Sequence, residues 1–365
     1  MKGDAGGPHP QPPLPKTGEG ANGISPNPLP GYESRQGATA GRNVLLRRAG
    51  FGGRGPLLVL IGAQLAVGSA ALMARAGLAA GLSPLVLGAW RLTVAAAIVL
   101  AGRFLTRGRS TTAAPSGRDR AILVVAGLCL SAHFVVWFAS LRFIPVARST
   151  LLVTTAPLWA GLGSIVFLRQ RLPGRFWAGL AVAAVGAWLV TSNGAQLATV
   201  LPAGAGHAAA GDLLAILGAV AVAAYLLLTE RRQTTLGTST VIAWTYSSAA
   251  IWTWVALGFF PSSGGVRPPS SAAWLSVLGM AAVPQLIGHT SLNWCLRFFP
   301  AGVVSAATLL EPVFAGTLAW VLLGEPLTTM QLAGAAILLA GVALSLWNPP
   351  QPVHPARDEP AGAAI

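Results

Sequence analysis

The sequence has 365 residues, of which 53% are hydrophobic and only 9% charged, and its formal net charge is +14. Soluble globular domains carry about 25% charged residues, so this composition excludes an ordinary soluble fold. The basic residues are scattered between apolar runs, which is typical of the flanks of membrane helices and argues against a nucleic-acid partner. We therefore expect a multi-pass membrane protein whose main partner is the lipid bilayer.

The two ends of the chain differ from the rest in composition. Residues 1–55 are rich in proline and glycine and poor in apolar side chains, and the chain beyond Trp347 has the same character. Segments of this kind bury too little apolar surface to fold. We predict disordered tails at residues 1–55 and 348–365.

Long apolar runs fill the chain between the tails. A helix of about 20 apolar residues crosses a hydrocarbon core of about 30 Å. The runs do not alternate as barrel strands do, so we predict an all-α membrane protein. Ten transmembrane helices are expected, at residues 56–74, 84–105, 121–143, 149–168, 176–192, 212–229, 240–260, 273–295, 301–323 and 330–347.

The chain contains an internal repeat. At a constant shift of 155 residues, "LRFIPVARSTLLVTTAPLWAG" (141–161) matches "LRFFPAGVVSAATLLEPVFAG" (296–316), and Pro157 coincides with Pro312. This shift divides the chain into halves at 56–193 and 212–347, each with five predicted spans. Because five is odd, the second half enters the membrane in the opposite orientation. Two inverted five-helix repeats are typical of secondary transporters, whose solute sites lie between the repeats.

The segment "GHTSLNWCLRFFPAGVVSAATLLEPVFAGTLAWVLLGEPLT" resembles the second repeat of EamA-type transporters in the drug/metabolite transporter superfamily. The resemblance implies an exporter-like carrier of small metabolites in the cell membrane, of bacterial type. The first half departs from the family pattern, because its Gly-Glu slot reads "LRQRLP" and Ala156 occupies the slot of Glu311. Any role of the family's Gly-Glu carboxylate therefore carries over only to Glu325.

Polar residues inside apolar spans are candidates for a solute path, because such residues usually face protein or a water-filled cavity. Gln285, His289 and Asn293 are spaced four apart, which places them on one helix face, and Pro284 is expected to bend that helix. The alternative is that these residues only hold helices together by hydrogen bonds. The candidate pathway residues are Gln64, His133, Trp137, Tyr225, Gln285, His289, Asn293 and Trp294.

Glu311 is predicted to lie near the middle of the span 301–323 and to act in coupling or gating. Pro312 lacks an N–H and frees the carbonyl of Thr308, so the helix should be bent or loosened at these three residues. Glu311 either couples proton movement to transport or only caps the loosened backbone as a neutral acid. We expect Arg91 to reach outward to the membrane surface, although it and His289 are also candidate positive charges near Glu311.

The predicted function is secondary transport, with export of small metabolites, amino acids or drugs by alternating access and proton coupling as an option. The alternatives are an intramembrane enzyme that uses Glu311 and the histidines, and a channel. The chain has no P-loop, no Gly-x-Ser-x-Gly and no His-Glu-x-x-His motif, so we predict neither an ATP-driven pump nor an enzyme. Cys129 and Cys295 indicate no metal site, and no cofactor is expected.

The small-residue faces of two spans raise the question of oligomeric state. Gly179 and Gly186 lie two helical turns apart in one span, and Gly334 and Gly341 repeat that spacing in another. Small faces let helices approach closely. We predict that they pack within a monomer, with a homodimer contact as the alternative.

The distribution of Lys and Arg predicts the orientation in the membrane. Nineteen fall in segments that the ten-span topology places on the side of the N-terminal tail, and four fall on the other side. The positive-inside rule then puts both termini in the cytoplasm. Reporter fusions after residues 110, 200 and 350 should therefore report inside, outside and inside. An external C-terminus would contradict the ten-span, inverted-repeat topology.

Overall fold

The structure is a computed structural model, and it describes residues 54–106, 114–140, 143–144, 146–191, 205–262, 264–324 and 327–347. Every regular element in these ranges is helical, as predicted. The predicted tails at 1–55 and 348–365 and the predicted family carboxylate Glu325 lie almost wholly outside these ranges.

In the described residues of the first half, seven helices form five spans. The first span is α2 (Arg54–Gly68) followed by α3 (Ala70–Ala79), and the second is α4 (Pro84–Leu105). The third is α5 (Gly117–Ser140). The fourth is divided into α6 (Val146–Val153) and α7 (Ala156–Val166), and the fifth is α8 (Gly174–Thr191).

The second half repeats this order. Its spans are α10 (Ala205–Leu236), then α11 (Thr238–Phe259), then a composite of α12 (Ser271–Met280), the π-helix η1 (Ala281–His289) and α13 (Thr290–Cys295). The next span joins α14 (Ala301–Ala307), the 3₁₀ turn η2 (Thr308–Leu310) and α15 (Glu311–Leu323). The last span is α16 (Thr329–Leu346).

Nine of these spans are long and apolar enough to cross a membrane, counted over the described ranges. The tenth is α11, whose 22 residues extend for about 33 Å at 1.5 Å per residue. Its threonines, serines and Tyr246 lower its hydropathy, and several of them are buried inside the protein. The chain is therefore an all-α membrane protein with ten transmembrane helices.

Local sequence signals set where several helices begin and end. Ser83 and Ser270 accept hydrogen bonds from the first turns of α4 and α12, and Thr328 forms a capping box with Gln331 at the start of α16. Gly324 ends α15 with φ of 69°, a left-handed conformation that glycine adopts without steric cost.

The helix contacts follow the inverted repeat. The pair α5 and α10, spans three and six, has its counterpart in the contact of α2 with η1, spans one and eight. Each of the other spans contacts its own counterpart in the other half. Span two contacts span seven (α4 with α11), span four contacts span nine (α7 with α14), and span five contacts span ten (α8 with α16). The two halves are thus inverted five-helix repeats that interlock throughout the bundle.

The broken spans match in detail. The 155-residue shift carries Val146, the first residue of α6, onto Ala301, the first residue of α14. It also carries Ala156 of α7 onto Glu311 of α15, so each span is interrupted at the same place, just before Pro157 or Pro312. The predicted loosening at Thr308–Pro312 is confirmed as a 3₁₀ turn, and Pro284 lies within a π-helix.

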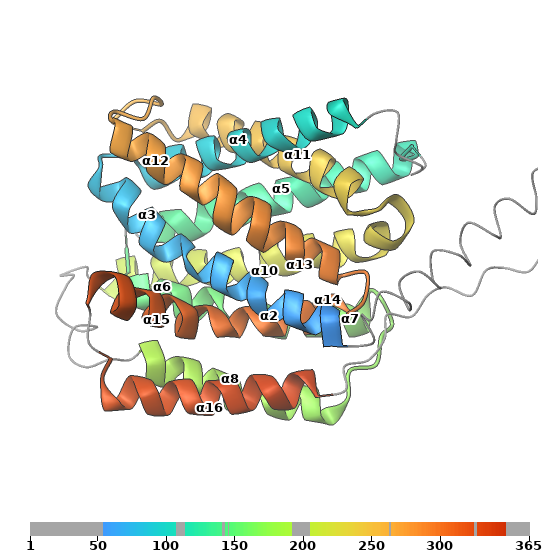
Figure 1. Cartoon of the computed structure of the whole chain (residues 1–365), viewed down its shortest axis with the longest axis vertical. Helices are drawn as coiled ribbons and strands as arrows, with labels where there is room; N and C mark the ends of the chain where they lie inside the picture. Colours follow the sequence, from blue (N-terminus) through green and yellow to red (C-terminus); the bar gives the residue numbers. More distant parts are fainter. Residues whose placement is uncertain are drawn as a thin grey trace, which may run out of the picture. The chain divides into compact units, whose positions relative to one another are not determined.

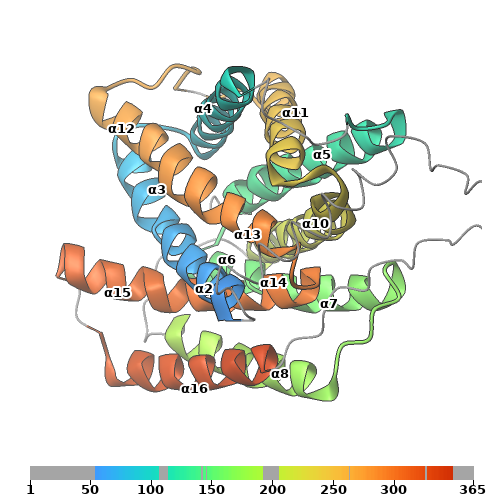
Figure 2. The ribbon, with the colours of Figure 1, turned by 45° about the vertical axis from the view of Figure 1, so that its right-hand side comes forward.

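The two glycine faces meet each other. Helices α8 and α16 lie side by side along one edge of the bundle, at the bottom of Figures 1 and 2. A Cβ on Gly186 would lie 2.3 Å from the backbone nitrogen of Leu338, and one on Gly341 would lie 2.3 Å from that of Ala183. This confirms packing within the chain and leaves these faces covered, so a homodimer contact through them is wrong.

Substitution of Gly186 tests this close approach. Gly186→Ala should lower the free energy of unfolding by about 1–3 kcal/mol, because the new methyl group meets backbone atoms that cannot move aside. Gly102→Ala in α4 is the matched control, because its Cβ would have no neighbour within 4 Å. That control should leave stability unchanged or raise it by about 0.5–1 kcal/mol. Thermal unfolding in detergent measures both, and equal midpoints for the two variants would contradict the packing.

Candidate functional site

A cavity lies at the seam between the two halves. The first half contributes α2 to α7 and the second half contributes α10, the π-helix, α13, α14, η2 and α15. The lining residues with polar or aromatic side chains are Arg91, His133, Phe134, Trp137, Thr150, Thr154, His289, Ser305, Thr308 and Glu311. Such a mixed polar and aromatic lining suits a small organic solute.

Arg91 is the buried cation of this cavity. It extends inward from α4 and is only 1% exposed, so the expectation that it reaches outward is wrong. Its Nε donates a hydrogen bond to Oε1 of Gln285 at 2.9 Å, and its guanidinium carbon lies 4.3 Å from the centre of the Phe134 ring. These contacts replace the water that the side chain would find at the membrane surface.

Glu311 is the acidic residue of the cavity. It is the first residue of α15, directly after the 3₁₀ turn, and Thr308 and Pro312 line the cavity with it. Glu311 and Arg91 line the same cavity, but the structure records no direct ion pair between these two described residues. The cavity therefore holds a guanidinium and a carboxyl group that are not joined as an ion pair.

Aromatic side chains form one wall between these charges. His133 Nδ1 donates to the carbonyl oxygen of Gly218 at 2.9 Å, which fixes its ring, and Trp137 stacks on it at 5.7 Å between ring centroids. Phe134 contacts His289 edge-on, with centroids 5.9 Å apart. The predicted pathway residues His133, Trp137 and His289 are thus brought together on the cavity.

The other predicted pathway residues do not line this cavity. Gln64 bonds back to the carbonyl of Leu60, and Trp294 packs on Phe298. Asn293 donates to the hydroxyl of Tyr225 at 2.5 Å and accepts from Gln233 at 2.9 Å, which ties α13 to α10. A pathway role for Gln64, Tyr225, Gln285, Asn293 and Trp294 stays a prediction.

One end of the bundle carries a set of contacts between the halves. We call it the terminal end, because α2 begins and α16 ends there, at the right in Figure 1. The Glu230 carboxylate, 3% exposed, accepts hydrogen bonds from the Gln170 side chain and, at 2.8 Å, from the backbone N–H of Ala301. Glu230 of α10 thereby joins the segment after α7 to the start of α14.

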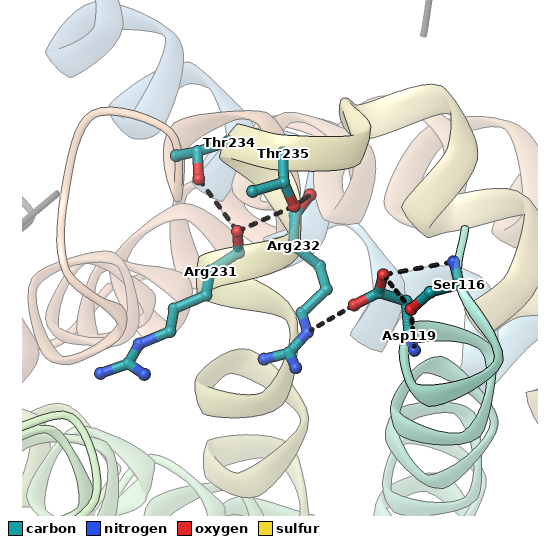
Figure 3. Close-up of polar contacts among 6 residues, drawn as sticks. All are labelled: Ser116, Asp119, Arg231, Arg232, Thr234 and Thr235. Carbon is teal, nitrogen blue, oxygen red and sulfur yellow. Dashed lines mark hydrogen bonds and ion pairs between the residues drawn. The ribbon is translucent and has the colours of Figure 1, made fainter. Parts of the chain in front are cut away.

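A second, more exposed contact lies at the same end. Figure 3 shows Arg232 of α10 reaching Asp119 at the start of α5, with 3.5 Å between Nε and Oδ1. Ser116 holds the same carboxylate through its backbone N–H and its hydroxyl. Partly exposed ion pairs of this kind contribute little stability, so Glu230 is the more consequential link.

The two matching half-helices differ in burial. Helix α14 begins at the terminal end, and all seven of its residues are buried. In α6, its counterpart at the other end, Ser149 is buried, whereas Arg148 and residues 150–153 are only half-buried. Arg91 and Trp137, which line the cavity, lie in the halves of α4 and α5 that are farther from the terminal end. The protein is therefore more closely packed at the terminal end.

Sequence reasoning missed Phe134 and Glu230. Phe134 is one aromatic residue in an apolar run, and Glu230 precedes Arg231 and Arg232 and resembles an ordinary flanking charge. Glu230 directly follows the predicted span 212–229, so nothing in the sequence distinguished it from a residue at the membrane surface. No group of three His, Cys, Asp or Glu suited to a metal occurs among the described residues.

Comparisons with known proteins give a consistent result. The chain is 24% identical over 270 residues to the "Uncharacterized transporter YdfC" of Bacillus subtilis, covering 73% of this chain and 83% of that protein. It is 28% identical over 268 residues to a "Probable terminal-alkyne amino-acid exporter" of Streptantibioticus cattleyicolor, covering 70% and 81%. A "Probable amino-acid metabolite efflux pump" of Salmonella typhimurium is 38% identical over 74 residues, 20% of this chain and 25% of the pump.

A solved structure shares the fold. A chain titled "Crystal structure of protein" aligns with a TM-score of 0.65 and 21% sequence identity, covering 80% of this chain and 96% of that chain. The family model described as the EamA-like transporter family matches twice, at residues 54–192 and 209–347. The chain belongs to the EamA-like transporter family, and it is a membrane transporter.

Proposed function

We propose that this transporter exports small organic metabolites across the cell membrane by alternating access. The observation that carries the proposal is a cavity at the seam of two inverted repeats that both halves line, with a few polar side chains among apolar ones. A solute held there changes sides when the halves rearrange around it, so no continuous pore is needed. Because the cavity is complete within one chain, a monomer is the proposed functional unit.

The relatives indicate a class of solute. Two of them are named for export of an amino acid or of amino-acid metabolites. The cavity of this chain offers a cation, a carboxyl group and aromatic walls, which suit a small molecule with both charged and apolar parts. We propose amino-acid-like metabolites as the first class to assay, ahead of drugs.

The burial difference between α6 and α14 indicates to which side of the membrane the cavity opens. Under the positive-inside rule the terminal end is cytoplasmic, and it is closed by Glu230 and by the fully buried α14. The half-buried α6 lies at the external end. We infer an outward-facing conformation, and we propose that the inward-facing one exchanges these roles, with α6 buried and the Glu230 contacts broken.

Glu311 is the proposed site of proton exchange. It stands where the helix is interrupted, in a cavity it shares with Arg91, His133 and His289, which are the charged or titratable groups facing it. Gain or loss of a proton here changes the charge that Arg91 experiences, and so changes the relative stability of the two conformations. The alternative is a structural cap that stays neutral.

The decisive assay is solute flux in proteoliposomes with and without a pH gradient. The parent protein should move amino-acid-like solutes faster under a gradient, with a rate that depends on pH between pH 5.5 and 8.5. Glu311→Gln should remain folded and flatten this pH profile, because the amide keeps a hydrogen-bonding group but cannot titrate. Glu311→Ala should slow transport by about tenfold or more, since the hydrogen-bonding group is lost too.

The same data separate the competing explanations. A Gln variant with the parent's rate and pH profile would leave Glu311 a structural cap only. Flux that is proportional to concentration without saturation would favour a channel instead of a carrier.

Thiol labelling tests the outward-facing conformation. The 155-residue shift pairs Thr150 of α6, which is half-buried, with Ser305 of α14, which is fully buried. In a background of Cys129→Ala and Cys295→Ala, Thr150→Cys should react with a small charged thiol reagent at least about tenfold faster than Ser305→Cys. Equal rates, or faster labelling at residue 305, would contradict an outward-facing cavity.

A further inference from the structure

Two residues that line the cavity carry hydrogen-bonding atoms that the described protein does not use. Nη2 of Arg91 and Nε1 of Trp137 are buried and have no hydrogen-bond partner among the described residues. Buried polar groups are nearly always paired, so two such atoms beside one cavity point to a polar solute that supplies the partners.

The contacts of Arg91 fix its side chain in a position where it can bind such a partner. Its Nε is occupied by Gln285 and its face by Phe134, so the side chain has little freedom left. Nη2 remains, because it is buried and has no hydrogen-bond partner among the described residues. A planar guanidinium with a free edge matches the two oxygens of a carboxylate, which an ammonium group of lysine does not.

The charge balance specifies the solute further. A purely anionic solute would be attracted by Arg91 but repelled by an ionised Glu311, and a purely cationic one would experience the reverse. Arg91 and Glu311 line the same cavity, and no ion pair is recorded between these two described residues, so an ionised Glu311 would leave both charges open to a solute. A zwitterion compensates both charges at once, and burial makes an uncompensated charge costly.

The remaining walls accommodate an apolar group. Val67, Val222, Leu226 and Leu292 line the cavity together with Pro312. A solute whose charged end lies between Arg91 and Glu311 would place an aliphatic or aromatic remainder against these side chains. Burial of each additional CH₂ group contributes about 0.8 kcal/mol, which favours apolar over polar remainders.

We propose that Arg91 binds the carboxylate, and Glu311 the ammonium group, of a zwitterionic solute with an apolar side chain. The proposal rests on the transport function proposed above and adds the groups that recognise the solute. Arg91 is then the residue that makes the cavity selective for solutes with a carboxylate.

Matched probes separate the two charged groups of the solute. Leucine, 3-methylbutylamine and 4-methylpentanoate share one apolar part. Leucine carries both charges, 3-methylbutylamine carries only the ammonium group, and 4-methylpentanoate carries only the carboxylate. Phenylalanine, phenethylamine and 3-phenylpropanoate form a second set. Radiolabelled uptake into proteoliposomes that contain the full-length protein should be at least about tenfold faster for the zwitterion of a set than for its two partners.

Variants then assign each group. Arg91→Gln should slow zwitterion flux about 10- to 100-fold, the range expected for loss of a hydrogen-bonded charge, and should leave the slow amine flux unchanged. Arg91→Lys should retain an intermediate rate. Glu311→Gln should instead slow zwitterion and amine but not the carboxylate. Arg118→Gln is the matched control, because Arg118 is an exposed arginine of α5 outside the cavity.

The results that would overturn the proposal are distinct from misfolding and from failure of the transport function. Thermal unfolding in detergent identifies folded variants, and Arg91→Met provides a second, apolar replacement that leaves no unpaired amide. A folded Arg91 variant that slows all three probes equally, or a parent that moves the amine as fast as the zwitterion, overturns the assignment. Export of other metabolites by the parent would then leave the transport function standing.

Discussion

The absence of water from the hydrocarbon core is the constraint on which the rest of this structure depends. A backbone break or a charged side chain inside a bilayer is stable only where protein or a wet cavity replaces the lost water. This chain concentrates such features at one place. The interrupted spans four and nine, the buried Arg91 and the carboxyl of Glu311 all lie at the seam between the repeats, where both halves contribute partners. The outer faces of the bundle keep apolar side chains for lipid.

The inverted repeat explains how such a seam can also move. Two halves of similar sequence can adopt each other's conformation, so one arrangement of the bundle implies a second with its ends exchanged. The two halves are not in the same conformation here. Helix α14 is wholly buried beside the Glu230 contacts, while its counterpart α6 is half-exposed beside the cavity. The rigid pairing of α8 with α16 through their glycines offers a fixed edge against which the remaining helices can shift.

Much of the architecture was predictable because membrane spans are read from composition and length. The all-α fold, the ten spans, the repeat and the break before Pro312 follow from apolar runs and proline chemistry. The site was less predictable. Gln285, His289 and Asn293 are four apart, yet Gln285 bonds Arg91, His289 faces the cavity and Asn293 bonds Tyr225. The π-helix at Ala281–His289 changes the number of residues per turn, so regular four-residue spacing no longer marks one face. Arg91 points inward because it donates a hydrogen bond to Gln285 and packs on the ring of Phe134, two residues that are distant from it in sequence.

The most direct test of the account is a distance measurement across the terminal end. Spin labels at Arg171 and Thr234, two exposed positions on either side of the Glu230 contacts, report whether that end opens. Electron–electron double resonance in nanodiscs should give two distance populations, a shorter one that matches the structure and a longer one. The longer population should grow when Glu230→Ala removes the link between the halves. A single distance that Glu230→Ala leaves unchanged would contradict alternating access through this end.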